Sequence, residues 1–214
     1  MANRAFIVGD SQAEGAGAYL EKRLVRDGWT VERSAKHGAD SAGVLKLAQQ
    51  QADKTYDLVV VFSGSTAGGA PAAKGIPALF PSAKMYWFGS GPATVIKSLS
   101  TARAVFGKKV SDDNYWFSSG EAAAREARNV ELPKLLPPSV QYVDWRSLAL
   151  SDAVTQPSGV VFPNLNDGIH VTGSTAAAAF EGANWPPQQV KLGSLLPLAL
   201  AGVALWWAWR KGWL

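Results

Sequence analysis

Short apolar runs that alternate with helix-like segments most constrain the fold of this 214-residue chain. Residues 58–62 form an unbroken β-branched and apolar run, typical of a strand buried on both faces. Similar runs occupy residues 5–8, 85–88 and 140–143, and residues 29–33 alternate in polarity like a half-buried strand. The sequence therefore predicts five strands.

Helix-like segments separate these runs. Ala16, Leu20 and Leu24 recur at helical spacing, and Gly28 follows as a residue suited to end a helix. Five strands separated by helices predict an α/β fold, a three-layer domain around a mainly parallel, doubly wound sheet. Further helices are predicted at residues 44–52, 93–106, 118–136 and 176–180.

The composition changes near the C-terminus. Residues 192–209 are 18 consecutive uncharged residues, and tryptophans gather beside the basic pair Arg210-Lys211. As a helix this stretch would span about 27 Å, close to the hydrocarbon thickness of roughly 30 Å. We therefore expect a globular domain at residues 1–185, a Pro-rich linker at 186–191 and a transmembrane helix at 192–214. A buried or amphipathic helix is the alternative, but the stretch has no polar face.

The side of the membrane stays open. Arg210 and Lys211 favour a cytoplasmic C-terminus and an external domain. The N-terminus shows no signal-peptide pattern, which favours a tail-anchored protein whose domain stays where it was made. The two cues conflict, and a protein of a viral membrane would follow neither cleanly. The expected location is a membrane with a single C-terminal span.

The charge and residue counts exclude several classes of partner and cofactor. The net charge is +4 and basic residues are scattered, so no nucleic-acid partner is expected. The absence of cysteine rules out disulfides and thiolate metal sites, and two histidines are too few for a multi-histidine centre. We expect no metal and no cofactor. The sequence leaves the oligomeric state open.

A motif that suggests a nucleophile follows the first predicted strand. Gly9-Asp10-Ser11-Gln12 lies between this strand and the first helix, at the strand end where open α/β folds bind ligands. A backbone N–H near a helix N-terminus can donate to a developing oxyanion. Serine needs a base to become a good nucleophile. Taken alone, the motif is also that of an ordinary turn with a helix cap.

A candidate base lies near the other end of the domain, before its last helix. His170 follows Asp167 across a Gly-containing turn, so that the carboxylate can orient one imidazole nitrogen while the other faces a serine. With the first motif, this arrangement resembles the GDSL/SGNH hydrolase family over residues 4–184. The resemblance implies Ser11 as nucleophile, His170 as base and Asp167 as orienting acid. Gly38, after the second strand, matches the glycine that joins the oxyanion hole.

The third block departs from the family. Where the family has G-x-N-D after the third strand, Thr66 and Ala67 follow Gly64 and Ser65. Losing one oxyanion donor typically costs about 10²–10³ in rate. Either Ser65 or Thr66 substitutes, or backbone amides do, or the enzyme is slow.

The resemblance implies an esterase or deacetylase acting on acyl esters of lipids or O-acetylated glycans. The altered third block supports one alternative, a catalytically decayed SGNH scaffold. Such a protein would serve as a membrane-anchored structural or binding protein, for example an envelope or virion component.

Overall fold

The computed structural model describes residues 3–64, 69–91, 119–145, 154–156, 159–161 and 171–182. These residues all belong to one compact unit that extends to Ala183. The predicted helix at 93–106, the linker at 186–191 and the predicted membrane span at 192–214 lie outside them. No helix in the described part of the chain is both long enough and apolar enough to cross a membrane.

Five parallel strands form the central sheet, in the order β2-β1-β3-β4-β5. Their bounds are β1 Arg4–Gly9, β2 Thr30–Ala35, β3 Leu58–Phe62, β4 Lys84–Phe88 and β5 Val140–Val143. The strand order reverses between β1 and β3, as in doubly wound folds, where ligands bind outside the carboxyl ends of the strands at the switch point. The predicted fold class and all five strands are confirmed.

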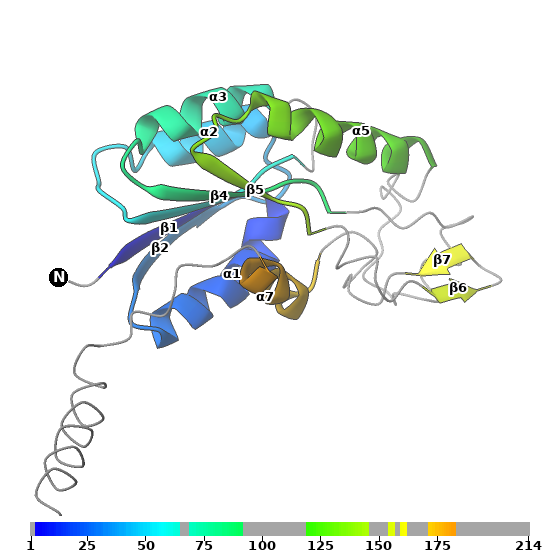
Figure 1. Cartoon of the computed structure of the whole chain (residues 1–214), viewed down its shortest axis with the longest axis horizontal. Helices are drawn as coiled ribbons and strands as arrows, with labels where there is room; N and C mark the ends of the chain where they lie inside the picture. The colour runs from blue at the N-terminus through cyan, green and yellow to red at the C-terminus, as the bar shows by residue number, and fades with distance from the viewer. Residues whose placement is uncertain are drawn as a thin grey trace, which may run out of the picture. The chain divides into compact units, whose positions relative to one another are not determined.

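Helices cover both faces of this sheet, giving the three layers (Figure 1). One face carries α2, α3 and α5, and the other carries α1 and α7. The helix bounds are α1 Ser11–Arg26, α2 Ser41–Gln49, α3 Ala70–Leu79, α5 Ser119–Leu135 and α7 Gly173–Gly182. A separate pair of short antiparallel strands, β6 Val154–Gln156 and β7 Gly159–Val161, lies between β5 and α7 in the sequence.

The sheet buries side chains on both of its faces, as its apolar strands require. Phe6 and Val8 of β1 belong to the core beneath α2 and α3, whereas Ile7 contacts α1 at Gly17. On the α1 side the rings of Phe62 and Phe88 stack with centroids 4.8 Å apart at the carboxyl ends of β3 and β4. Full burial of such side chains contributes roughly 1.5–3 kcal/mol each. The carboxyl edge of the sheet therefore rests on a well-packed core.

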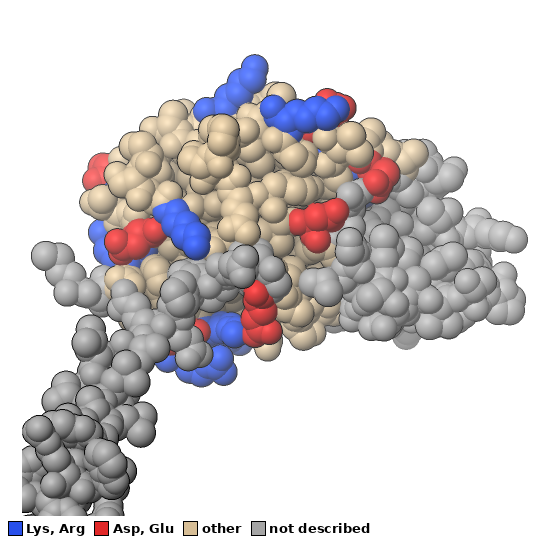
Figure 2. Space-filling model, viewed as in Figure 1, with Lys and Arg blue, Asp and Glu red and all other residues tan. Residues whose placement is uncertain are grey.

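Charged pairs gather at the amino ends of the strands instead. Glu32 accepts hydrogen bonds from Lys54 at 2.6 Å and Arg4 at 2.8 Å, and together they lower the pKa of its carboxyl. Burial raises the pKa of the neighbouring Tyr56 to about 12. On the face seen in Figure 2, acidic and basic side chains lie near one another rather than in patches of one sign. The bonds of Glu32 with Arg4 and Lys54 therefore link the amino ends of neighbouring strands.

Candidate active site

Ser11 occupies the junction between β1 and α1. Asp10 caps the helix, because its buried carboxylate accepts the Gln12 N–H at 2.9 Å. Ser11 is the first helical residue and is partly exposed. The first N–H groups of a helix have no partner within the helix, so the Ser11 N–H is suited to bind an anion. The predicted nucleophile thus lies at the carboxyl edge, as expected.

Gly9 is required here by the close approach of two strands. A Cβ atom on Gly9 would lie 2.3 Å from the carbonyl oxygen of Phe62 and 2.7 Å from its Cβ. The Asp10 N–H donates to that same carbonyl at 3.1 Å. Only glycine lets β1 reach β3 this closely and still turn into α1. The packing of β1 against β3 therefore explains why the Gly-Asp-Ser motif begins with glycine.

The turn that contains Gly38 lies against the first turn of α1. The Lys36 N–H donates to the Gly9 carbonyl at 3.1 Å, which carries the chain along β1 beyond the end of β2. The Glu14 carboxylate of α1 then accepts the His37 N–H at 2.8 Å. Gly38 has a φ of +68°, in the left-handed region that favours glycine. The structure thus brings the predicted oxyanion glycine beside the helix that Ser11 begins.

Of the third block, the structure describes only the first residue. Gly64 follows β3 with a φ of +134°, a backbone conformation that L side chains rarely adopt. Ser65 and Thr66, the predicted oxyanion donors, lie outside the described residues. Their role stays a prediction.

Asp167 and His170 also lie outside the described residues, but the residue that follows His170 does not. The Val171 N–H donates to Gln12 Oε1 at 3.1 Å, a bond between residues 159 positions apart in the sequence. Gln12 is 2% exposed and directly follows Ser11. One hydrogen bond therefore ties the neighbour of the predicted base to the neighbour of the predicted nucleophile.

Helix α7 packs along α1 and supports this junction. Arg23 of α1 forms an ion pair with Glu181 of α7 at 2.6 Å. At the other end of α7, a Cβ on Gly173 would lie 2.5 Å from the Tyr19 side chain, so the two helices touch closely there. Because the chain enters α7 just after residue 170, α1 determines where that entry lies.

Sequence reasoning missed a buried polar network at the same edge. Asn129 of α5 donates to the Ser90 carbonyl at 2.9 Å and accepts from the Tyr142 hydroxyl at 3.0 Å. The Ser90 hydroxyl in turn donates to the Gly64 carbonyl. Asparagine is a poor helix former, and its presence in an Ala/Arg/Glu-rich helix is the sequence feature that could have indicated a specific role for Asn129.

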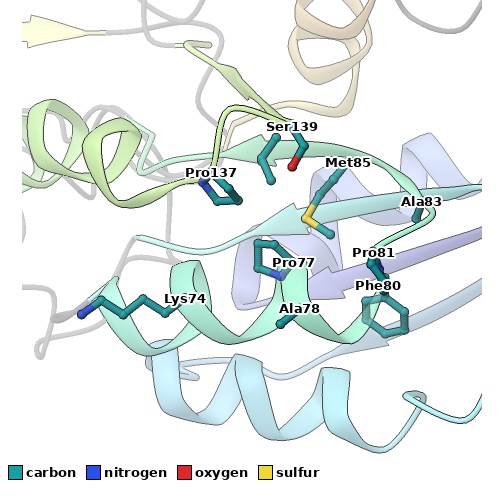
Figure 3. Close-up of a pocket in the computed structure, with 10 residues that line it drawn as sticks. Lys74, Pro77, Ala78, Phe80, Pro81, Ala83, Met85, Pro137 and Ser139 are labelled. Carbon is teal, nitrogen blue, oxygen red and sulfur yellow. The ribbon is translucent and has the colours of Figure 1, made fainter.

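A pocket of about 350 Å³ lies away from this junction (Figure 3). Met85 and Val140 stand at the amino ends of β4 and β5, the opposite edge from Ser11. The pocket therefore has no part in the site built around Ser11. Its lining comes from Lys74, Pro77, Ala78, Phe80, Pro81, Ala83, Met85, Pro137, Ser139 and Val140.

Comparison with known proteins identifies the fold. No family model and no curated protein matches the chain. An extracellular lipase of Streptomyces rimosus is 13% identical with a TM-score of 0.55, over 85% of this chain and 98% of that one. A lipolytic G-D-S-L family member from Veillonella parvula is 8% identical with a TM-score of 0.53, over 88% and 100%. The catalytic domain of a Streptococcus pneumoniae peptidoglycan O-acetyltransferase is 16% identical with a TM-score of 0.51, over 86% and 96%.

These matches confirm the fold that the resemblance implies. The solved structures that share this fold include lipases, acetyltransferases of lipopolysaccharide and peptidoglycan, and a member of the lipolytic G-D-S-L family. The five-stranded α/β domain has the same architecture as these structures, although the sequence identity is low.

Proposed function

We propose that this protein is a serine hydrolase of the SGNH type that cleaves carboxylic esters. Ser11 is the nucleophile, His170 the general base and Asp167 the acid that orients the imidazole. The observation that carries the proposal is the hydrogen bond from Val171 to Gln12. His170 directly precedes Val171, and Ser11 directly precedes Gln12. Because consecutive Cα atoms are 3.8 Å apart, the bond limits how far the backbone of His170 can lie from that of Ser11.

The proposed reaction proceeds through an acyl-enzyme. The Ser11 hydroxyl attacks the ester carbonyl while His170 takes its proton, and the tetrahedral oxyanion accepts N–H bonds from Ser11 and Gly38. His170 then gives the proton to the leaving alcohol. Water attacks the acyl-serine, again losing its proton to His170, and the acid is released as Ser11 regains a proton. The segment that holds Ser65 and Thr66 supplies the remaining oxyanion contact.

Among substrate classes, we favour acyl esters of lipids or O-acetylated glycans. The structural neighbours are named as lipases and as acetyltransferases of lipopolysaccharide and peptidoglycan. An anchored enzyme would meet lipids or surface glycans most readily.

Labelling with a fluorophosphonate probe tests the nucleophile without knowledge of the substrate. We expect the full chain to be labelled at Ser11, as located by mass spectrometry, and the Ser11→Ala variant to remain unlabelled. Ser82→Ala is the matched control, because Ser82 is exposed in the turn before β4 at the opposite edge. A folded wild-type chain that takes no label, and hydrolyses no ester, would instead support the decayed scaffold.

We also propose that residues 192–214 anchor the protein in a membrane by a single helix. The full chain should then need detergent to stay in solution and should float with lipid vesicles on a density gradient. Leu200→Arg places a charge near the centre of the span, which costs roughly 2.5–3.5 kcal/mol of insertion free energy, so flotation should fall. A full chain that is soluble and monomeric without detergent would rule out the anchor.

A further inference from the structure

A chain of hydrogen bonds, fully buried except at its Tyr142 end, links three strands at the carboxyl edge of the sheet, and the proposed mechanism does not use it. It starts at Tyr142 of β5, whose hydroxyl donates to Asn129 at 3.0 Å. Asn129 donates to the Ser90 carbonyl beyond β4, and the Ser90 hydroxyl donates to the Gly64 carbonyl beyond β3. The last residue reached is the one that precedes the predicted oxyanion donors.

These polar groups are held in the core at a cost, so their placement calls for a reason. Ser90 is 0% exposed and Asn129 is 3% exposed. Buried polar groups are tolerated when they are hydrogen-bonded, and a satisfied network favours one arrangement of its members. Both halves of the Asn129 amide are engaged, one toward β5 and one toward the turn after β4. The network thus fixes positions rather than adding apolar stability.

Close packing reinforces the same arrangement. A Cβ on Gly89 would lie 2.3 Å from the Tyr142 hydroxyl and 2.5 Å from Asn129 Oδ1, so the backbone there rests directly on their bond. On α5, Leu132 lies one turn beyond Asn129 and is buried. A Cβ on Gly64 would lie 3.3 Å from its side chain, and one on Gly69 would lie 3.0 Å from it. The side chain of Leu132 therefore contacts the two described residues that flank the third block, Gly64 and Gly69.

We infer that Ser90 and Asn129 are positioning residues for oxyanion stabilisation, acting through the backbone of Gly64. This inference rests on the proposed function. The carbonyl of Gly64 belongs to the planar peptide unit that leads into the third block, so the bond from Ser90 holds the backbone at the point where that block begins. Where the family has an asparagine side chain, this chain has a rotatable threonine hydroxyl or backbone amides. Such donors depend on how firmly their backbone is held.

Removing the Ser90 hydroxyl tests the inference. Ser90→Ala should lower kcat for ester hydrolysis about tenfold while KM stays nearly constant, because misplaced donors weaken only the transition state. The inhibition constant of a boronic acid, which forms a tetrahedral adduct on serine, should rise by the same factor. Ser90→Thr keeps a hydroxyl and should recover part of the loss. All rates are taken per active site, titrated by the fluorophosphonate burst.

Tyrosine variants give a matched pair for the far end of the network. Tyr142→Phe removes the hydroxyl that holds Asn129 and should lower kcat in the same direction, less than Ser90→Ala does. Tyr56→Phe removes a similar hydroxyl, which donates to Gln51 Oε1 at 3.3 Å at the sheet's amino edge. It should change thermal stability alone.

The outcomes separate the two claims. If Ser90→Ala and Tyr142→Phe lower only the melting temperature, and kcat and boronate affinity per active site are unchanged, the network is structural and the inference is wrong. If the wild-type chain shows no Ser11-dependent turnover, the proposed function fails and the inference fails with it.

Discussion

Replacing Ser11 with alanine should lower kcat/KM for a short-chain aryl ester by about 10⁴–10⁶-fold, leaving the fold intact. Ser11 is partly exposed at the start of α1, and the helix is capped by the Asp10 carboxylate, which the substitution leaves in place. The measurement is the release of p-nitrophenol by the full chain, with circular dichroism to check folding. His170→Ala should have an effect of similar size, because an unactivated serine is a weak nucleophile.

The losses of activity caused by the two substitutions should not be additive. Groups that act as one catalytic unit lose nearly everything with the first removal, so Ser11→Ala with His170→Ala should be no slower than either alone. His37→Ala is the control, since His37 is the other histidine and lies beside the Gly38 turn, paired with Glu14 at 3.6 Å. It should leave most of the activity. Equal losses from both histidine variants would contradict the assignment of His170.

Replacing Gly9 with alanine should destabilise the protein by about 3 kcal/mol, the upper range for forcing atoms into a packed core. The added methyl group would overlap the Phe62 carbonyl and Cβ, which are backbone-bound and cannot rotate away. Relief would need β1 and β3 to separate at the centre of the sheet. Urea unfolding followed by tryptophan fluorescence measures this loss.

Gly15→Ala is the matched control for that change. Gly15 is exposed within α1, and a Cβ there would meet no atom within 4 Å outside the neighbouring backbone of its own helix. Alanine in an exposed helix interior should stabilise by roughly 0.5–1 kcal/mol. An unchanged unfolding midpoint for Gly9→Ala would show that the strands are not as closely apposed as described.

Strand prediction succeeded where local composition decides the structure. The run at residues 58–62 is apolar throughout because β3 lies between two strands and beneath helices on both faces, so no position needs a polar side chain. Helix α3, which contains Pro71 and Pro77, was not predicted. Pro71 stands in its first turn, where the missing N–H costs nothing, and Pro77 near its end.

The candidate site was predictable only in part, because local sequence determines some of its positions and long-range contacts determine the others. Ser11 and Gly38 could be placed because each directly follows a strand, and parallel strands bring their carboxyl ends to one edge. The bond between Gln12 and Val171 could not be predicted, since no local pattern records a contact across 159 positions. Asn129 was missed for the same reason, because its two partners, Ser90 and Tyr142, lie 39 and 13 positions away in the sequence.

The bond between Gln12 and Val171 joins a residue that is synthesised early to one that is synthesised late. Ribosomes add about 5–20 residues per second, so α1 emerges well before the residue it must hold. Until then the polar end of Gln12, buried in the finished domain, lacks this partner. A nascent chain thus displays Ser11 early, but the bond that holds Val171, the neighbour of the proposed base, forms only when helix α7 begins to leave the ribosome. If the proposed function holds, hydrolysis begins only once the domain is nearly complete.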